Sequence, residues 1–114
     1  MQKRYVRVAA EIESLVQGYG SCIASDRITV DGRQVGYMYR EGPYSPLDSG
    51  WRFLAGDESD EYLNNPDHLG LFDVNTIANY DRAIIEHLQA AFGTAFLREG
   101  DHFIVDNSFI PPGD

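Results

Sequence analysis

The stretch that decides the fold is Ser49–Asp81, which reads SGWRFLAGDESDEYLNNPDHLGLFDVNTIANYD. It contains the only tryptophan, Trp51, and the densest acidic run, residues 57–61. Residues 51–55 are predicted to form a β-strand, in which Trp51, Phe53 and Ala55 lie on one face and Arg52 and Leu54 on the other. Gly56 ends this strand. The central prediction is therefore a strand that ends in glycine and is followed by an acidic loop.

The rest of this stretch predicts a loop that leads into helical structure. Residues 57–67 are polar and form the loop, with one helical turn around residues 60–63. Residues 69–74 are short and apolar, which leaves two interpretations, a strand or a packed loop. Residues 75–79 are expected to form a helical turn.

A helix is predicted over residues 82–91. Asp81 is a suitable N-cap because its carboxylate accepts hydrogen bonds from the first free N–H groups of a helix. Gly93 is a suitable stop. The expected buried stripe consists of Ile84, Ile85, Leu88 and Phe92.

Residues 1–17 predict a second, N-terminal helix. Apolar residues recur there at three- and four-residue spacing, which places them on one helical face, and Gly18 follows as a stop. The basic residues of this segment lie at its start, against the helix dipole, at a cost of about a few tenths of a kcal/mol per charge. The apolar residues are Tyr5, Val8, Ala9, Ile12, Leu15 and Val16.

The remaining segments predict strands. Residues 21–24 resemble a short buried strand, and residues 27–39 predict a β-hairpin across Asp31-Gly32, a dipeptide that favours type I′ turns. A second hairpin is expected between residues 94–97 and residues 102–105, and the tail from residue 109 to residue 114 is expected to fray. We therefore expect one small α+β domain with a mostly antiparallel sheet.

Composition excludes several classes of protein. The chain has 114 residues, which fit one domain, and its formal net charge is −9. Nucleic-acid binding is disfavoured because it requires Lys and Arg to neutralise phosphates, whereas attraction to a basic protein is favoured. No apolar run approaches the roughly 18 residues of a membrane helix, and no export signal is expected. With a single cysteine, Cys22, these features predict a cytoplasmic protein.

No complete catalytic or metal motif is present. The acidic run suggests calcium, but a calcium loop that starts at Asp57 requires glycine at its sixth position, where this chain has Tyr62. A solvated acidic loop is the simpler interpretation, and a metal site that uses this run with His68 is the alternative. Cys22 has no signature of a nucleophile around it and is expected to be a buried strand residue. No cofactor and no enzymatic activity are expected.

Aromatic and acidic side chains remain as candidates for contact with a protein partner. Trp and Tyr supply large, rigid contact areas and dominate binding hot spots. The competing interpretation is that Trp51 is a core residue of its strand. The candidate partner-binding residues are Trp51, Asp57, Glu58, Asp60, Glu61, Tyr62 and Asp67.

Four segments carry a family resemblance: SCIASD at residues 21–26, VGYMYRE at residues 35–41, DSGWRFLAGDE at residues 48–58 and DVNTIANYD at residues 73–81. Together they resemble the bacterial immunity protein 33-like family, long catalogued as a domain of unknown function. The chain would then consist of an N-terminal helix, residues 1–18, outside the recognised region and a family domain, residues 19–114. The matched positions, which also suit structural roles, are Gly50, Trp51, Arg52, Gly56, Asp57, Asn75, Asn79 and Asp81.

The resemblance implies a cytoplasmic immunity protein that binds and blocks a cognate toxin of a polymorphic toxin system. It supplies no catalytic residues. The acidic segment 57–67, with Trp51 and Tyr62 as anchors, would contact a basic toxin surface. The alternatives are a small metal- or ligand-binding domain and a stand-alone protein that forms homo-oligomers.

Overall fold

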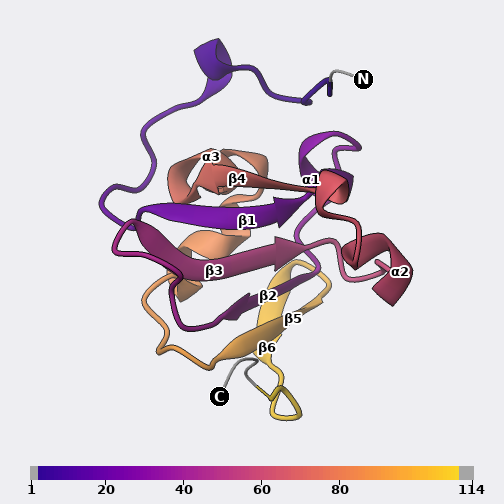
Figure 1. Ribbon diagram of the computed structural model, residues 1–114. Helices are drawn as coiled ribbons and strands as arrows, with labels where there is room; N and C mark the ends of the chain where they lie inside the picture. The colour runs from indigo at the N-terminus through magenta and orange to yellow at the C-terminus, as the bar shows by residue number, and fades with distance from the viewer. Residues whose placement is uncertain (1–2, 111–114) are drawn as a thin grey trace.

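A six-stranded mixed sheet forms the centre of the computed structural model, which describes residues 3–110 (Figure 1). The strands are β1 (Ser21–Ser25), β2 (Tyr37–Arg40), β3 (Asp48–Leu54), β4 (Leu69–Asp73), β5 (Ala95–Glu99) and β6 (His102–Val105). Their order is β4-β1-β3-β2-β5-β6. β1 and β3 run parallel, and the other neighbouring pairs run antiparallel. The predicted α+β class with a mostly antiparallel sheet is confirmed.

Short helices surround this sheet, and two of them, described below, cover one of its faces. The α-helices are α1 (Asp26–Thr29), α2 (Asp60–Leu63) and α3 (Val74–Tyr80), and the 3₁₀ helices are η1 (Ala9–Glu11), η2 (Pro66–His68) and η3 (Arg82–His87). α3 lies behind the sheet in Figure 1, and η3 follows it along the same face. Within residues 3–110, no helix is long and apolar enough to cross a membrane.

The core lies between the sheet and the segment formed by α3 and η3. Trp51 and Phe53 of β3 are fully buried on this side, and their rings stack with centroids 5.9 Å apart. The Trp51 indole N–H donates a hydrogen bond to the Leu88 carbonyl over 3.1 Å. Ile77 of α3 and Ile84 of η3 are also fully buried in this cluster. The strand predicted around Trp51 is therefore the central strand of the molecule.

The predicted N-terminal helix is wrong over the part of it that the structure describes. Residues 1–2 lie outside that part, and from residue 3 onward only η1 is helical. The cause is tertiary, because Asn75 and Asn79 of α3 bind the main chain of residues 13–16 in an extended form. These hydrogen bonds replace those that an isolated helix would have to make within itself.

The predicted hairpin across Asp31-Gly32 is also wrong. Its first half forms α1, which Ser25 caps by accepting a hydrogen bond from the Arg27 N–H over 3.2 Å. Gly32 has a positive φ of 79°, so the chain does turn there, but it turns after a helix. The second half supplies β2, which pairs with β3 and β5 rather than with the segment before the turn.

The segment after Asp81 is shorter than predicted. The Asp81 carboxylate caps η3 by accepting a hydrogen bond from the Ala83 N–H over 3.1 Å, but this 3₁₀ helix ends at His87. Leu88 is buried as expected, whereas Phe92 is 57% exposed and lies outside the core. The Phe92 ring instead packs against the Arg40 guanidinium, 4.5 Å from the ring centroid.

The other predicted elements are confirmed. They are the strands at residues 21–24 and 51–55, the helical turns at residues 60–63 and 75–79, and the second hairpin. Of the two interpretations of residues 69–74, the strand is correct, since β4 covers residues 69–73 and Val74 begins α3. Of the tail that was expected to fray, residues 111–114 lie outside the described part of the chain.

Candidate functional site

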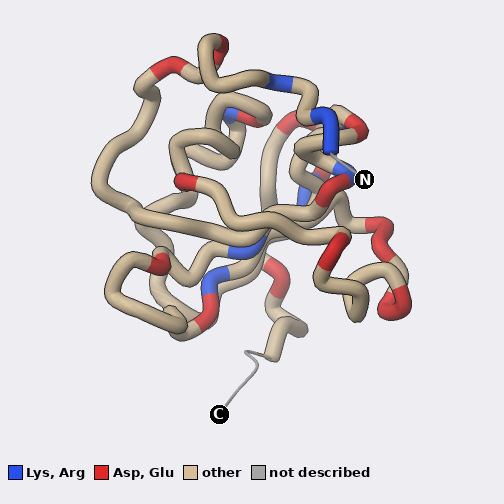
Figure 2. The backbone as a smooth tube through the Cα atoms, turned by 45° about the horizontal axis from the view of Figure 1, so that its top comes forward, with Lys and Arg blue, Asp and Glu red and all other residues tan. Residues whose placement is uncertain are grey.

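The acidic segment 57–67 joins β3 to β4 at one margin of the sheet (Figure 2). Asp57 opens this segment and forms ion pairs with Arg27, over 3.7 Å, and with Arg33. Glu58 follows and accepts hydrogen bonds from the N–H groups of Ala55 and Gly56, each over 2.8 Å. Both carboxylates therefore hold the loop in place.

Three other carboxylates of the segment are exposed and free. Asp60 and Glu61 lie in the first turn of α2, and Asp67 lies in η2. Within the described residues, none of these three side chains forms an ion pair or a hydrogen bond. They make up what we call the acidic margin, the part of the predicted site that remains open to a partner.

Tyr62 is the centre of a stack that closes the acidic segment. The Arg27 guanidinium lies 4.6 Å from the centroid of the Tyr62 ring, and the His68 ring stacks on Tyr62 at 4.0 Å. A His68 ring nitrogen also lies 2.8 Å from the Tyr62 carbonyl oxygen. Burial raises the pKa of the Tyr62 hydroxyl. Tyr62 therefore supports the fold of the segment and presents only part of its ring to solvent.

Trp51 offers no surface to a partner in this fold. Its side chain is fully buried on the helix-covered side of the sheet, where its N–H is already hydrogen-bonded. Of the two interpretations of Trp51, a partner-binding residue or a core residue, its position in the structure agrees with the second. Among the predicted site residues, the structure gathers the others in one segment and separates Trp51 from them.

The sheet face opposite α3 and η3, here called the open face, contains a pocket of about 190 Å³. Sequence reasoning did not identify this pocket. β1, β2 and β3 contribute to its floor, and the loop that precedes β3 and the acidic segment contribute to its walls. Its lining residues are Ile23, Tyr39, Glu41, Tyr44, Arg52, Leu54, Leu63 and Leu69.

An ion cluster lies at the base of the open-face pocket. Arg52 is 2% exposed and makes a bidentate pair with Asp48, over 2.9 Å and 2.8 Å, and a further pair with Glu41. The Tyr44 ring covers the guanidinium, which lies 4.9 Å from the ring centroid. Two carboxylates face one guanidinium, so the cluster has one excess negative charge when all three groups are ionised.

Asp48 and Arg52 stabilise one another in their ionised forms. The hydrogen bonds from Arg52 lower the pKa of Asp48 well below its usual range, against the effect of burial. Burial by itself would lower the pKa of Arg52, but the hydrogen bonds to Asp48 and Glu41 raise it. The sequence offered one clue, an arginine between two core aromatics with carboxylates upstream, but strand alternation does not reveal that a loop covers it.

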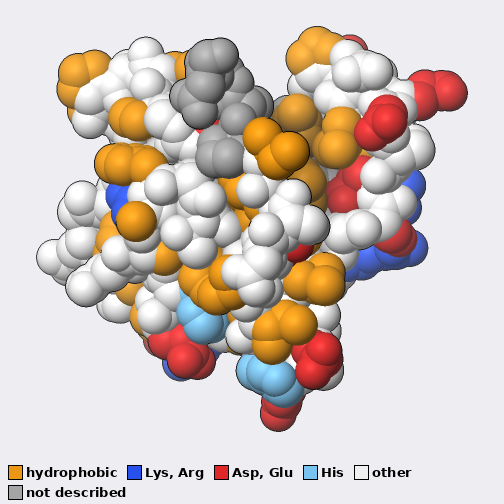
Figure 3. Space-filling view, turned by 90° about the horizontal axis from the view of Figure 1, so that it is seen from below, with side chains coloured by type: hydrophobic (Ala, Val, Ile, Leu, Met, Phe, Trp, Pro, Cys, Tyr) orange, Lys and Arg blue, Asp and Glu red, His pale blue; other side chains and the backbone are white. Residues whose placement is uncertain are grey.

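Hydrophobic side chains are spread over the side of the molecule seen in Figure 3, with acidic side chains gathered at its margin. Leu97 of β5 and Ile104 of β6 are 45% and 39% exposed. Tyr44 is 77% exposed beside the pocket. Exposed aromatic side chains are typical of protein-binding surfaces.

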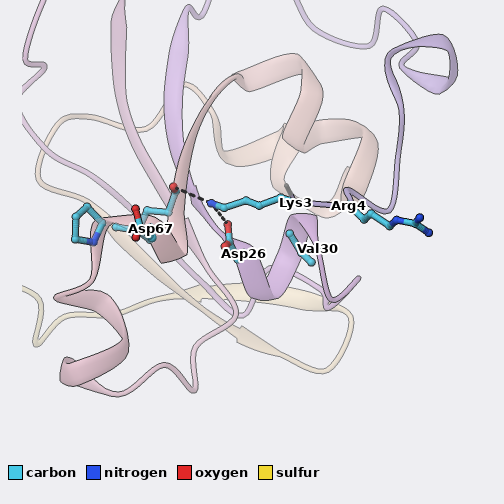
Figure 4. Close-up of a pocket in the computed structure, with 7 residues that line it drawn as sticks. Lys3, Arg4, Asp26, Val30 and Asp67 are labelled. Carbon is cyan, nitrogen blue, oxygen red and sulfur yellow. Dashed lines mark hydrogen bonds and ion pairs between the residues drawn. The ribbon is translucent and has the colours of Figure 1, made fainter. Parts of the chain in front are cut away.

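A larger hollow of about 880 Å³ separates the first described residues from α1 and η2 (Figure 4). The Lys3 ammonium points into it and binds the Asp26 carboxylate over 3.0 Å, whereas Arg4 points away. Asp67 lines the same hollow. Within residues 3–110, no three His, Cys, Asp or Glu side chains converge as metal ligands would.

The comparisons with known proteins identify one family. The model of the immunity protein Imm33 domain matches residues 22–106, which include the whole sheet except the first residue of β1. No curated protein and no solved structure matches the chain.

Proposed function

The chain belongs to the immunity protein Imm33 domain family, and from this membership we propose that it neutralises a cognate toxin by binding it. The protein acts without catalysis, in the cytoplasm, by covering a surface that the toxin needs for its activity. The family match is the observation that carries this proposal, and the free carboxylates beside the open face support a contact at that surface.

The proposed contact surface combines the acidic margin with the open-face pocket. Leu63 lies in α2 together with Asp60 and Glu61 and also lines the pocket, so the two features are continuous. Tyr44 supplies the exposed aromatic ring that Trp51 does not supply. A toxin with a basic surface fits this combination, because its Lys or Arg side chains would meet free carboxylates around an apolar centre.

The test is isothermal titration of the purified chain against proteins encoded next to it, with and without charge reversal of the acidic margin. We expect the triple variant to bind the toxin at least tenfold more weakly and to lose part of the salt dependence of binding, because attraction between opposite charges is screened by salt. The variant carries Asp60→Lys, Glu61→Lys and Asp67→Lys.

A matched control makes the same change of charge elsewhere on the surface. Its three positions are exposed and lie on η3, on β5 and in the turn before β6, and they should leave toxin affinity within about threefold of the original. Equal losses in both variants would mean that only net charge matters, and an unchanged affinity in the first variant would refute the acidic margin. The control carries Glu86→Lys, Glu99→Lys and Asp101→Lys.

A further inference from the structure

Residues 3–17, here called the leading segment, run along the top of the molecule in Figure 1, above β4 and α3. None of the residues in this segment is buried. The family match begins only at residue 22, so the leading segment lies outside it, whereas α3 lies inside it. α3, which belongs to the matched domain, therefore binds a segment that lies outside that domain.

Two asparagine side chains of α3 form the centre of this surface. The Asn79 amide oxygen accepts a hydrogen bond from the Glu13 N–H over 2.9 Å, and the Asn79 amide nitrogen donates to the Glu13 carbonyl over 2.8 Å. The Asn75 oxygen accepts from the N–H groups of Leu15 and Val16, over 2.8 Å and 3.1 Å, and its nitrogen donates to the Glu13 carbonyl over 2.9 Å. Every one of these contacts reaches main-chain atoms of the leading segment.

Tyr80, at the end of α3, continues the same pattern. Its hydroxyl oxygen accepts a hydrogen bond from the Arg7 N–H over 3.1 Å. Nearby, the Val6 N–H donates to the Thr29 carbonyl over 2.7 Å. Asparagine and tyrosine side chains that satisfy main-chain groups recognise an extended backbone largely irrespective of its side chains.

The apolar part of the contact is small and local. A groove of about 420 Å³ runs between the leading segment and α3, and Phe72 and Tyr80 line it from the domain side. The Tyr5 ring meets the Phe72 ring edge to face, with centroids 5.6 Å apart. Leu15 and Val16 pack against the core while staying partly exposed.

We propose that the outer face of α3 is a binding site for an extended polypeptide backbone, which the leading segment of the same chain fills and which accepts the leading segment of a second copy. The second copy is a fitting occupant because its segment presents the same main-chain donors and acceptors that already match the site. Gly18, at positive φ and with no atom within 4 Å of an added Cβ, lies between the segment and β1 and supplies a hinge.

Two full-chain variants with complementary defects test this proposal. The first carries Glu13→Pro and Leu15→Pro, which remove two N–H donors from its own segment and leave the site intact. The second carries Asn75→Ala and Asn79→Ala, which disable the site and leave its segment intact. Sedimentation velocity of the mixture should show a one-to-one heterodimer, and each variant alone should remain monomeric at the same concentration.

A monomeric mixture of two folded variants would overturn the second copy as occupant. Because Asn79 is 7% exposed, the second variant is first checked by the emission of Trp51, the only tryptophan. If that variant does not fold, a labelled peptide of residues 3–17 replaces it, and fluorescence anisotropy should show saturable binding to the first variant.

Chemical changes in that peptide test main-chain recognition directly. N-methylation at Leu15 removes the donor to Asn75 and should weaken binding at least tenfold, whereas Ser14→Ala should leave binding unchanged. Equal binding by the N-methylated peptide would refute recognition of the backbone. Absence of binding by the unmodified peptide to the folded first variant would refute the site.

Discussion

Arg52 shows at the scale of single residues how a charge is held inside this small domain. Its guanidinium is buried under Tyr44 on the open face and is paired with two carboxylates. Taking a charge out of water is costly, and the cost is offset only when the charge is fully hydrogen-bonded. The bidentate contact to Asp48 meets this requirement with the geometry that suits a guanidinium.

The variant Asp48→Asn should lower the free energy of unfolding at pH 7 by about 2 kcal/mol, because Arg52 loses one of its two carboxylate partners. The loss is not larger because Glu41 remains as a partner of Arg52. The pKa of Asp48 is lowered in the folded protein, so its stabilisation is present above about pH 4, the usual range of an unfolded aspartate, and is lost as the pH falls below it. Urea unfolding at pH 7, 5, 4 and 3 should therefore show the difference between the two proteins shrinking under acid. A difference that stays constant with pH would contradict this prediction.

Gly50 allows the pairing of β3 with the segment after β2. Its φ is 86°, and an added Cβ would lie 2.2 Å from the Glu41 carbonyl oxygen. Gly50→Ala should therefore destabilise the protein by more than the roughly 1–2 kcal/mol of backbone strain, because the backbone must also shift. The control is Gly18→Ala, where φ is 83° but no atom lies within 4 Å of the added Cβ. Equal losses of stability in the two variants, measured by thermal and urea unfolding, would mean that the steric contact is unimportant.

At the scale of elements, Asp81 connects three segments of the chain. One of its oxygens caps η3 through the Ala83 N–H, and the other accepts a hydrogen bond from the Val35 N–H over 3.0 Å and pairs with Arg98. The Arg98 guanidinium in turn donates to the Val35 carbonyl over 2.7 Å. The ion pair thus holds both main-chain groups of Val35, two residues before β2.

Asp81→Ala should therefore cost more than an ordinary helix cap. We expect a loss of roughly 3 kcal/mol, because the variant leaves Arg98 without its carboxylate as well as removing the cap. The comparison variant is Asp73→Ala, which removes only the cap of α3, a hydrogen bond from the Asn75 N–H over 2.8 Å, and should cost about 1 kcal/mol. Chemical denaturation of both variants measures the difference, and equal costs would rule out the wider role of Asp81.

At the scale of the whole molecule, one sheet separates two different surfaces. The face covered by α3 and η3 is a closed apolar core, and the open face combines apolar side chains, a buried ion cluster and free carboxylates. The core supplies the apolar burial that opposes the self-repulsion of a net charge of −9. Part of the negative charge is located next to the open-face pocket, because the free carboxylates of the acidic margin lie there.

Cys22 offers a measurement of the stability of the whole fold. It is the only cysteine, it is fully buried in β1, and burial raises the pKa of its thiol well above the usual range. We expect a thiol reagent at pH 8 to modify Cys22 only through global unfolding, so the labelling rate should rise with urea as the unfolding equilibrium does. Rapid labelling in the absence of urea would show a local opening of β1 instead.

Much of the fold follows from local signals. The strand around Trp51, the second hairpin and the cap at Asp81 depend on alternation, turn residues and capping chemistry, which act within a few residues. Asp60, Glu61 and Asp67 were among the candidates named from the sequence, because an acidic loop after a strand can be recognised from composition. The sequence did not separate these three carboxylates from those of Asp57 and Glu58, which the structure shows to be engaged in the loop. The role of the three free carboxylates in binding stays a prediction.

The errors arose where distant residues decide local structure. The apolar spacing of the leading segment favours a helix, but hydrogen bonds from Asn75 and Asn79 fix residues 13–16 as extended chain. Asp31-Gly32 favours a hairpin, but Ser25 starts a helix before the turn, and the sheet places β3 beside β1. At residues 13–16, tertiary hydrogen bonds outweigh a local preference of about 1 kcal/mol or less. At Asp31-Gly32, the local cap at Ser25 competes with the hairpin, and the pairing of β2 with β3 and β5 replaces it.

The sequence by itself determined the α+β class, the acidic character, the family resemblance and most strand positions, since these depend on composition and short-range pattern. Only the tertiary structure decided that Trp51 is a core residue, that Arg52 is a buried charge under a pocket and that α3 holds the leading segment. The physical reason is that burial and pairing depend on which segments cover one another. A loop that folds over Arg52 and a helix that presents two asparagines are set by contacts between residues far apart in the chain.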